Sequence, residues 1–227
     1  MTITNWILLG ALVISLGLLI VSYILKKIVL QKSCECLMLP LFGALNILLL
    51  RDYLPDSLHL IKITIVALSL ITVSTIFLAF EKVKALRVLG RILVLAGAFT
   101  WIYLYRTVFF IHKVPLWLII LMSVIYIAGM VTAIILSGKQ EVPFYILFAL
   151  SFALSSYLNF CSLVFLCYEK TGSSIMLFSG TCLFLALNAF HFVNQAKLKF
   201  KHAGIIRYNI LLASQILIAC SNILMIR

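Results

Sequence analysis

Polar side chains recur along the last three apolar stretches, and these are the residues that could bind or transform a small molecule. In and just beyond the stretch 174–193, steps of seven, three and four residues place one set on a single helical face: Thr181, Asn188, His191 and Gln195. An amide can orient a substrate or a water molecule, and an imidazole exchanges protons near neutral pH. A lone histidine within an apolar helix is uncommon, so Asn188 and His191 are the candidate catalytic residues.

The two neighbouring stretches carry polar sets of their own. Tyr208, Gln215 and Asn222 recur every seven residues, and the stretch 142–168 holds Ser151, Ser155, Asn159 and Ser162 on one face. We expect the three stripes to converge on a polar cup centred on Asn188, His191 and Tyr208, which opens toward one leaflet. Its candidate substrate-binding residues are Ser151, Asn159, Tyr208 and Gln215. The alternative is that these side chains only hydrogen-bond helix to helix, since such contacts stabilise membrane proteins by about 0.6–2 kcal/mol each.

Composition shows what kind of helices carry these stripes. Of 227 residues, 65% are hydrophobic and 11% are charged, with a mean hydropathy of +1.23, whereas soluble domains have about 25% charged residues. The charged residues separate apolar runs of about the 20 residues that a spanning helix needs. We therefore expect a single integral membrane domain over 1–227, an all-α polytopic bundle of about eight transmembrane helices.

Eight apolar runs are the expected spans: 6–25, 36–50, 63–80, 88–111, 114–137, 142–168, 174–193 and 205–226. The second run is short and contains Pro40, which removes a backbone donor, so a re-entrant segment is the alternative there. The first run is expected to remain as a span, because Lys26 and Lys27 follow it in place of a signal-peptide cleavage site.

Lysine and arginine predict the orientation. The first, third, fifth and seventh loops, with the helix ends beside them, hold most of them: Lys26, Lys27, Lys32, Lys82, Lys84, Arg87, Arg91, Lys139, Lys197, Lys199, Lys201 and Arg207. By the positive-inside rule these loops face the cytoplasm and both termini face outward, in a plasma or inner membrane. The net charge of +12 accordingly indicates contact with anionic lipid headgroups, and no nucleic-acid partner is expected. The block from Lys197 to Arg207 is interpreted as a topology determinant, and binding of a particular acidic lipid is the alternative.

The sequence lacks the residue patterns that several kinds of catalysis and metal binding require. All six acidic residues, Glu35, Asp52, Asp56, Glu81, Glu141 and Glu169, are expected in loops or at helix ends, which leaves no paired carboxylates within the membrane. Nucleotide-binding and nucleophile-elbow motifs are missing. The six cysteines lack zinc-ligand spacing, and inert packing is favoured over palmitoylation or metal binding at Cys34 and Cys36. We expect no cofactor and no metal.

The stretch from Gly180 to Asn194 resembles the signature of the YhhN family, whose members include the lysoplasmalogenases. Gly180, Phe184 and Asn194 match that signature, while Asn188 stands where the family has an aspartate. The run 215–219 and the dipeptide 39–40 are also similar to family segments. In the expected third helix, however, 72–75 lacks the family's second acidic residue, and the family's Ala-His pair in the fourth finds only Phe-Thr at 99–100.

The resemblance implies about eight helices and hydrolysis of the vinyl ether bond of lysoplasmalogens, with membrane lipids as partners and a lysophospholipid as substrate. It also adds Asn194 to the candidate substrate-binding residues. The reaction needs a general acid, a water molecule and a dry slot for the alkyl chain. Asn188 can orient water but cannot supply a proton, so His191 would have to act as the acid. The alternative is a non-enzymatic protein that binds lipid or transports a small solute through the same cup.

Overall fold

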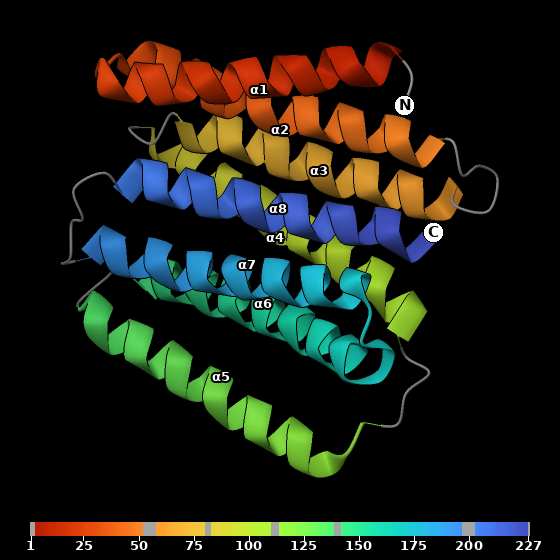
Figure 1. The fold of residues 1–227 in the computed structure, drawn as a ribbon. Coiled ribbons are helices and arrows are strands. Elements are labelled where there is room, and N and C mark those ends of the chain that lie inside the picture. The colour runs from red at the N-terminus through yellow and green to blue at the C-terminus, as the bar shows by residue number, and fades with distance from the viewer. Residues whose placement is uncertain are drawn as a thin grey trace. The chain divides into compact units, whose positions relative to one another are not determined.

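The computed structural model describes residues 3–51, 58–79, 83–109, 114–138, 142–196 and 203–226, in which all regular structure is helical. The helices are α1 (Ile3–Ile24), α2 (Ile28–Arg51), α3 (Leu58–Ala79), α4 (Lys84–Phe109), α5 (Leu116–Ser137), α6 (Val142–Glu169), α7 (Gly172–Ala196) and α8 (Ala203–Ile226) (Figure 1). Each is long and apolar enough to cross a bilayer. The predicted polytopic, all-α class is confirmed.

The second helix is longer than the sequence predicted. It begins at Ile28 and has 24 residues, a length of about 36 Å that exceeds the roughly 30 Å of hydrocarbon in a bilayer. Its polar first turns are stabilised within the helix, because Gln31 Nε2 donates to Glu35 Oε1 at 2.8 Å, four residues on. The helix also continues through Pro40, whose side chain is exposed. α2 therefore has the length of a full span instead of that of a re-entrant segment.

The helices form two compact units. The first comprises Met1–Trp101 with Met225–Arg227, and in it α2 packs against both α1 and α3. α3 and α4 approach closely at two glycines. A Cβ added at Gly97 would lie 2.6 Å from Ile71 Cγ1, and the Ser74 hydroxyl donates to the Gly90 carbonyl at 2.7 Å.

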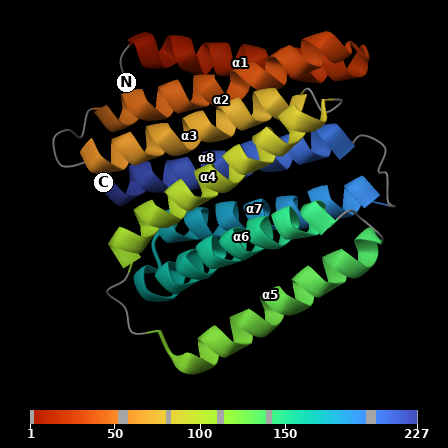
Figure 2. The same ribbon diagram turned by 180° about the vertical axis from the view of Figure 1, so that it is seen from behind.

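The second unit, Ile102–Leu224, contains the candidate site. α6 packs along α7, with α5 against both, and α6 and α7 lie side by side in both ribbon views (Figure 2). Phe148 of α6 stacks on Phe192 of α7 with 3.8 Å between ring centroids, and Ala133 of α5 belongs to the same buried cluster. This apolar cluster fixes the three helices beside the polar stripes of α6 and α7.

α8 is held to the second unit by a close approach and by hydrogen bonds. At Gly180 of α7, an added Cβ would lie 2.9 Å from Ile218 Cγ1 and 2.9 Å from the Ser214 carbonyl oxygen, so the absence of a side chain lets α7 and α8 touch. One turn beyond Ile218 on α8, the Tyr105 hydroxyl of α4 donates to Asn222 Oδ1 at 2.9 Å. These contacts set the position of α8 relative to α7.

Candidate functional site

The predicted stripes of α6 and α7 meet at Asn188. The Ser151 hydroxyl of α6 donates to Asn188 Oδ1 at 3.0 Å, and Asn188 Nδ2 donates to the Phe184 carbonyl at 3.2 Å. Both polar residues are half-buried. The amide is thus held in one orientation, with its oxygen toward α6, and retains one N–H with which it could donate to a ligand.

Asn159 lies further along the contact between α6 and α7, called here the α6–α7 seam, and both its Oδ1 and its Nδ2 have hydrogen-bond partners. Its side chain is 3% exposed, its Oδ1 accepts from the Tyr126 hydroxyl of α5 at 2.8 Å, and its Nδ2 donates to Thr181 Oγ1 at 3.1 Å and Cys182 Sγ at 3.2 Å. Ser162 adds a 2.6 Å contact with the Thr181 hydroxyl. A ligand could reach Asn159 only by breaking these bonds, so at this position the geometry supports helix-to-helix hydrogen bonding.

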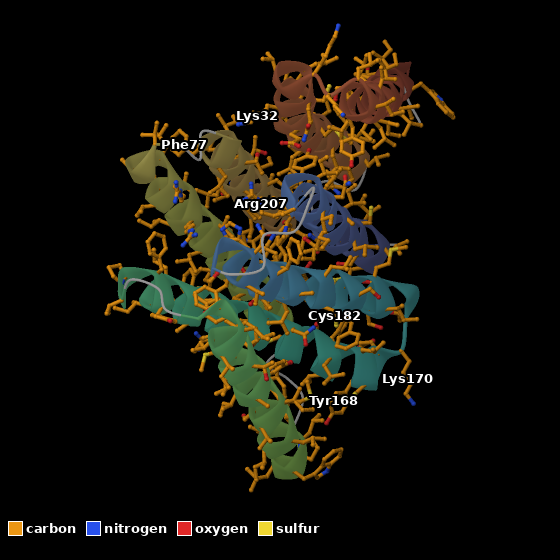
Figure 3. All side chains as sticks on the ribbon, turned by 90° about the vertical axis from the view of Figure 1, so that its left-hand side faces the viewer. Lys32, Phe77, Tyr168, Lys170, Cys182 and Arg207 are labelled. Carbon is orange, nitrogen blue, oxygen red and sulfur yellow. The ribbon has the colours of Figure 1, made fainter. Side chains whose placement is uncertain are left out.

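His191 contacts α8 through an arginine. Arg207 Nη1 lies 3.3 Å from His191 Nδ1, and both side chains are half-buried. A guanidinium only donates, so Nδ1 must accept and the ring proton is assigned to Nε2. Arg207 is labelled in Figure 3. The pair presents N–H donors from two helices at one place.

The His191–Arg207 pair lies near the membrane boundary. α7 has 25 residues and is about 38 Å long, which leaves roughly 4 Å at each end beyond a 30 Å hydrocarbon layer. His191 precedes the end of α7 at Ala196 by five residues, and Arg207 follows the start of α8 at Ala203 by four. For helices centred on the hydrocarbon layer, both Cα atoms would lie a few ångströms inside it, from where an arginine side chain can extend to the headgroup level.

The remaining predicted residues occupy different surroundings. Asn194 is half-buried and lies three residues beyond His191 toward the end of α7. Tyr208 is 6% exposed and Gln215 is 0% exposed, and Gln215 Nε2 donates to Ser214 Oγ at 3.3 Å. Asn222, the third residue of the predicted α8 stripe, bonds to Tyr105 of α4, a partner that sequence analysis did not name. The side chain of Gln195 lies outside the described residues.

Two residues of this region were missed as partners in the sequence. Arg207 was interpreted as part of a basic block that sets the topology, with acidic-lipid binding by that block as the alternative, and its contact with His191 was not predicted. Tyr126 is the phenol within the apolar α5, and a buried phenol usually has a hydrogen-bond partner. That signal could have identified Tyr126 as a third contributor to the α6–α7 seam.

Acidic and metal-binding groups are sparse in the described part of the chain. α7 and α8 contain neither aspartate nor glutamate, and Glu169 ends α6 while Glu35 lies in α2. The other four acidic residues lie outside the described ranges. Within those ranges no group of three or more His, Cys, Asp or Glu side chains could hold a metal ion.

No protein-family model, curated protein or solved structure matches this chain. The resemblance to the YhhN family stays a prediction that rests on the α7 residues. Two of these residues have a packing role in the structure: Gly180 allows the contact with α8, and Phe184 is 1% exposed.

Proposed function

We propose that this multi-pass membrane protein binds a single-chain phospholipid whose phosphate is held by Arg207 and His191. The observation that carries the proposal is the 3.3 Å contact between these side chains. A guanidinium offers five N–H donors in one plane, so it can contact His191 and a phosphate oxygen at the same time. With its Nδ1 accepting from Arg207, His191 can add the Nε2 proton as a further donor.

Local charge and depth support a phosphate ligand. α7 and α8 contribute no acidic side chain, and the sequence between them adds Lys197, Lys199 and Lys201, so positive charge prevails at this end of the pair. Lipid phosphates lie just outside the hydrocarbon layer, at the level that the Arg207 side chain can reach.

The position of Asn188 supports a lipid with a free or ether-linked glycerol oxygen. Asn188 precedes His191 by three residues on one face of α7, about 4.5 Å deeper in the membrane. In a phospholipid the glycerol lies below the phosphate by a similar amount. Asn188, oriented by Ser151 at 3.0 Å, would donate to a glycerol oxygen while the headgroup contacts Arg207.

Hydrolysis of a vinyl ether is the second candidate function. It is favoured by the placement of Asn188, which stands at the position of the YhhN aspartate and shares a helix face with His191. Cleavage requires protonation of the enol ether carbon. A neutral imidazole is a weak proton donor and an amide is none, so the residues present support lipid binding better than catalysis.

Binding is tested with full-length protein in detergent, by native mass spectrometry with a lysophospholipid and with a monoacylglycerol of the same chain. We expect the lysophospholipid to bind more tightly, and Arg207→Gln to weaken that binding by about ten- to a hundredfold, as loss of a charged hydrogen bond worth about 1.5–3 kcal/mol predicts. Lys170→Gln is the matched control, because this substitution also removes one positive charge. Lys170 follows the end of α6 at Glu169, far along the chain from the α7–α8 connection beside Arg207. Equal loss in both variants would contradict the proposal.

Catalysis is tested by following aldehyde release from lysoplasmalogen. We expect little or none from the natural protein and measurable release from Asn188→Asp, because burial favours the protonated carboxyl, which can donate a proton. Substantial release by the natural protein that His191→Ala abolishes would instead show that His191 is the acid. Phospholipid binding without release in either protein would leave binding as the function.

A further inference from the structure

The first unit contains a buried amide that its own helices leave unsatisfied. Asn46 of α2 is 0% exposed, and neither its Nδ2 nor its Oδ1 has a hydrogen-bond partner among the described residues. An amide contributes two donors and two acceptor sites. Burying all of them unbonded in an apolar helix pair is costly, so native proteins satisfy such groups with side chains, backbone or ordered water.

The packing of α2 against α3 places a second polar side chain opposite Asn46. A Cβ added at Gly43 of α2 would lie 3.6 Å from Leu68 Cδ1 of α3, and the two helices lie side by side in both ribbon views (Figures 1 and 2). Asn46 follows Gly43 by three residues, and Thr64 precedes Leu68 by four. Because consecutive spans run in opposite directions, one turn along each helix brings Asn46 and Thr64 to the same level.

Thr64 shares the burial of Asn46. It is 0% exposed, and both residues lie about 8–9 Å from the α2–α3 connection, as the rise per residue gives from Arg51 and Leu58. The site therefore combines an amide with four hydrogen-bonding positions and a hydroxyl, and neither group is charged. A neutral molecule with two or more polar partners fits this chemistry.

We propose that Asn46 and Thr64 form a buried water site between α2 and α3. A single ordered water accepts from the Asn46 Nδ2 and donates to the Thr64 hydroxyl oxygen, which gives the amide a partner without opening the helix pair. This site is independent of the phosphate site, because its residues belong to the first unit.

The test uses the full-length protein in lipid bilayers with ¹⁵N-labelled asparagine side chains. In water-edited solid-state NMR we expect polarisation transfer from water to the Asn46 amide, whose signal is assigned by its loss in Asn46→Leu. Thr64→Val should reduce that transfer at least about twofold while leaving the water contacts of the Asn194 amide unchanged. Absence of transfer to Asn46, or transfer unaffected by Thr64→Val, would overturn the proposal.

Thermal unfolding provides a second measurement. Replacing an amide that has no partner with leucine should raise the Tm, whereas replacing one that binds an ordered water should lower it. We therefore expect Asn46→Leu to lower the Tm and Thr64→Val to add little once Asn46 is replaced, because both residues act through the same water. A higher Tm in Asn46→Leu would contradict the water site.

Discussion

Substitution of Gly180 by alanine tests the contact that holds α7 to α8. The new Cβ would lie 2.9 Å from Ile218 Cγ1, 2.9 Å from the Ser214 carbonyl oxygen and 3.0 Å from the Ile218 backbone nitrogen. A side chain could rotate away, but the two Ser214 and Ile218 backbone atoms move only with α8. The helices must separate by about 0.5 Å to restore an ordinary 3.4 Å contact.

Two opposing effects set the magnitude. Alanine is favoured over glycine within a helix by about 1 kcal/mol, whereas overpacking a well-packed contact costs about 1–3 kcal/mol. The expected net result for Gly180→Ala is a loss of up to about 2 kcal/mol. For a chain of this size that lowers the Tm by up to about 8 °C.

Gly17→Ala is the matched control. A Cβ at Gly17, in the interior of α1, meets nothing within 4 Å, so the helix preference acts there without a steric cost. We expect an unchanged or higher Tm for Gly17→Ala and a lower one for Gly180→Ala, measured by scanning fluorimetry of detergent-solubilised protein. A Gly180→Ala variant stabilised as much as Gly17→Ala would show that α7 and α8 do not meet at Gly180.

Two further substitutions test the packing. Asn159→Leu should destabilise the second unit by about 1–3 kcal/mol, because it removes the acceptor of the half-buried Tyr126 hydroxyl and the amide that donates to Thr181, whose hydroxyl keeps its contact with Ser162; an unchanged denaturation midpoint would contradict the hydrogen-bonded seam. Pro40→Ala should raise the Tm, since Pro40 lies inside α2 with an exposed side chain and alanine restores a backbone hydrogen bond without loss of packing; a lower Tm would show that Pro40 is needed for the course of α2.

The eight spans could be predicted because charged residues in a membrane protein concentrate where helices leave the bilayer. The start of α2 could not, because Gln31 and Glu35 look like a break in the apolar pattern. Their side chains hydrogen-bond to each other at 2.8 Å, so the helix accommodates both. Whether two polar residues satisfy each other depends on their rotamers, which the sequence does not specify.

The seam between α6 and α7 was predictable in outline and not in detail. Helical spacing placed Thr181 and Asn188 on one face, and in the structure both bond to residues of the predicted α6 stripe. Spacing alone cannot choose the partner helix, since that depends on how neighbouring helices are offset. For the same reason the spacing placed Asn222 on a stripe of α8 without naming its partner, Tyr105 of α4.

The most direct test of the account is the distance between Arg207 and a bound lipid phosphorus. Full-length protein with ¹³Cζ-labelled arginine, in bilayers containing a lysophospholipid, would be measured by ¹³C–³¹P dipolar recoupling. We expect one arginine carbon within about 5 Å of phosphorus, as a direct guanidinium–phosphate hydrogen bond requires, and that signal should be lost in Arg207→Gln and retained in Lys170→Gln. Phosphate binding at this site would be contradicted if the arginine ¹³C–³¹P signal persisted in Arg207→Gln. It would also be contradicted if the natural protein gave no such signal at saturating lipid.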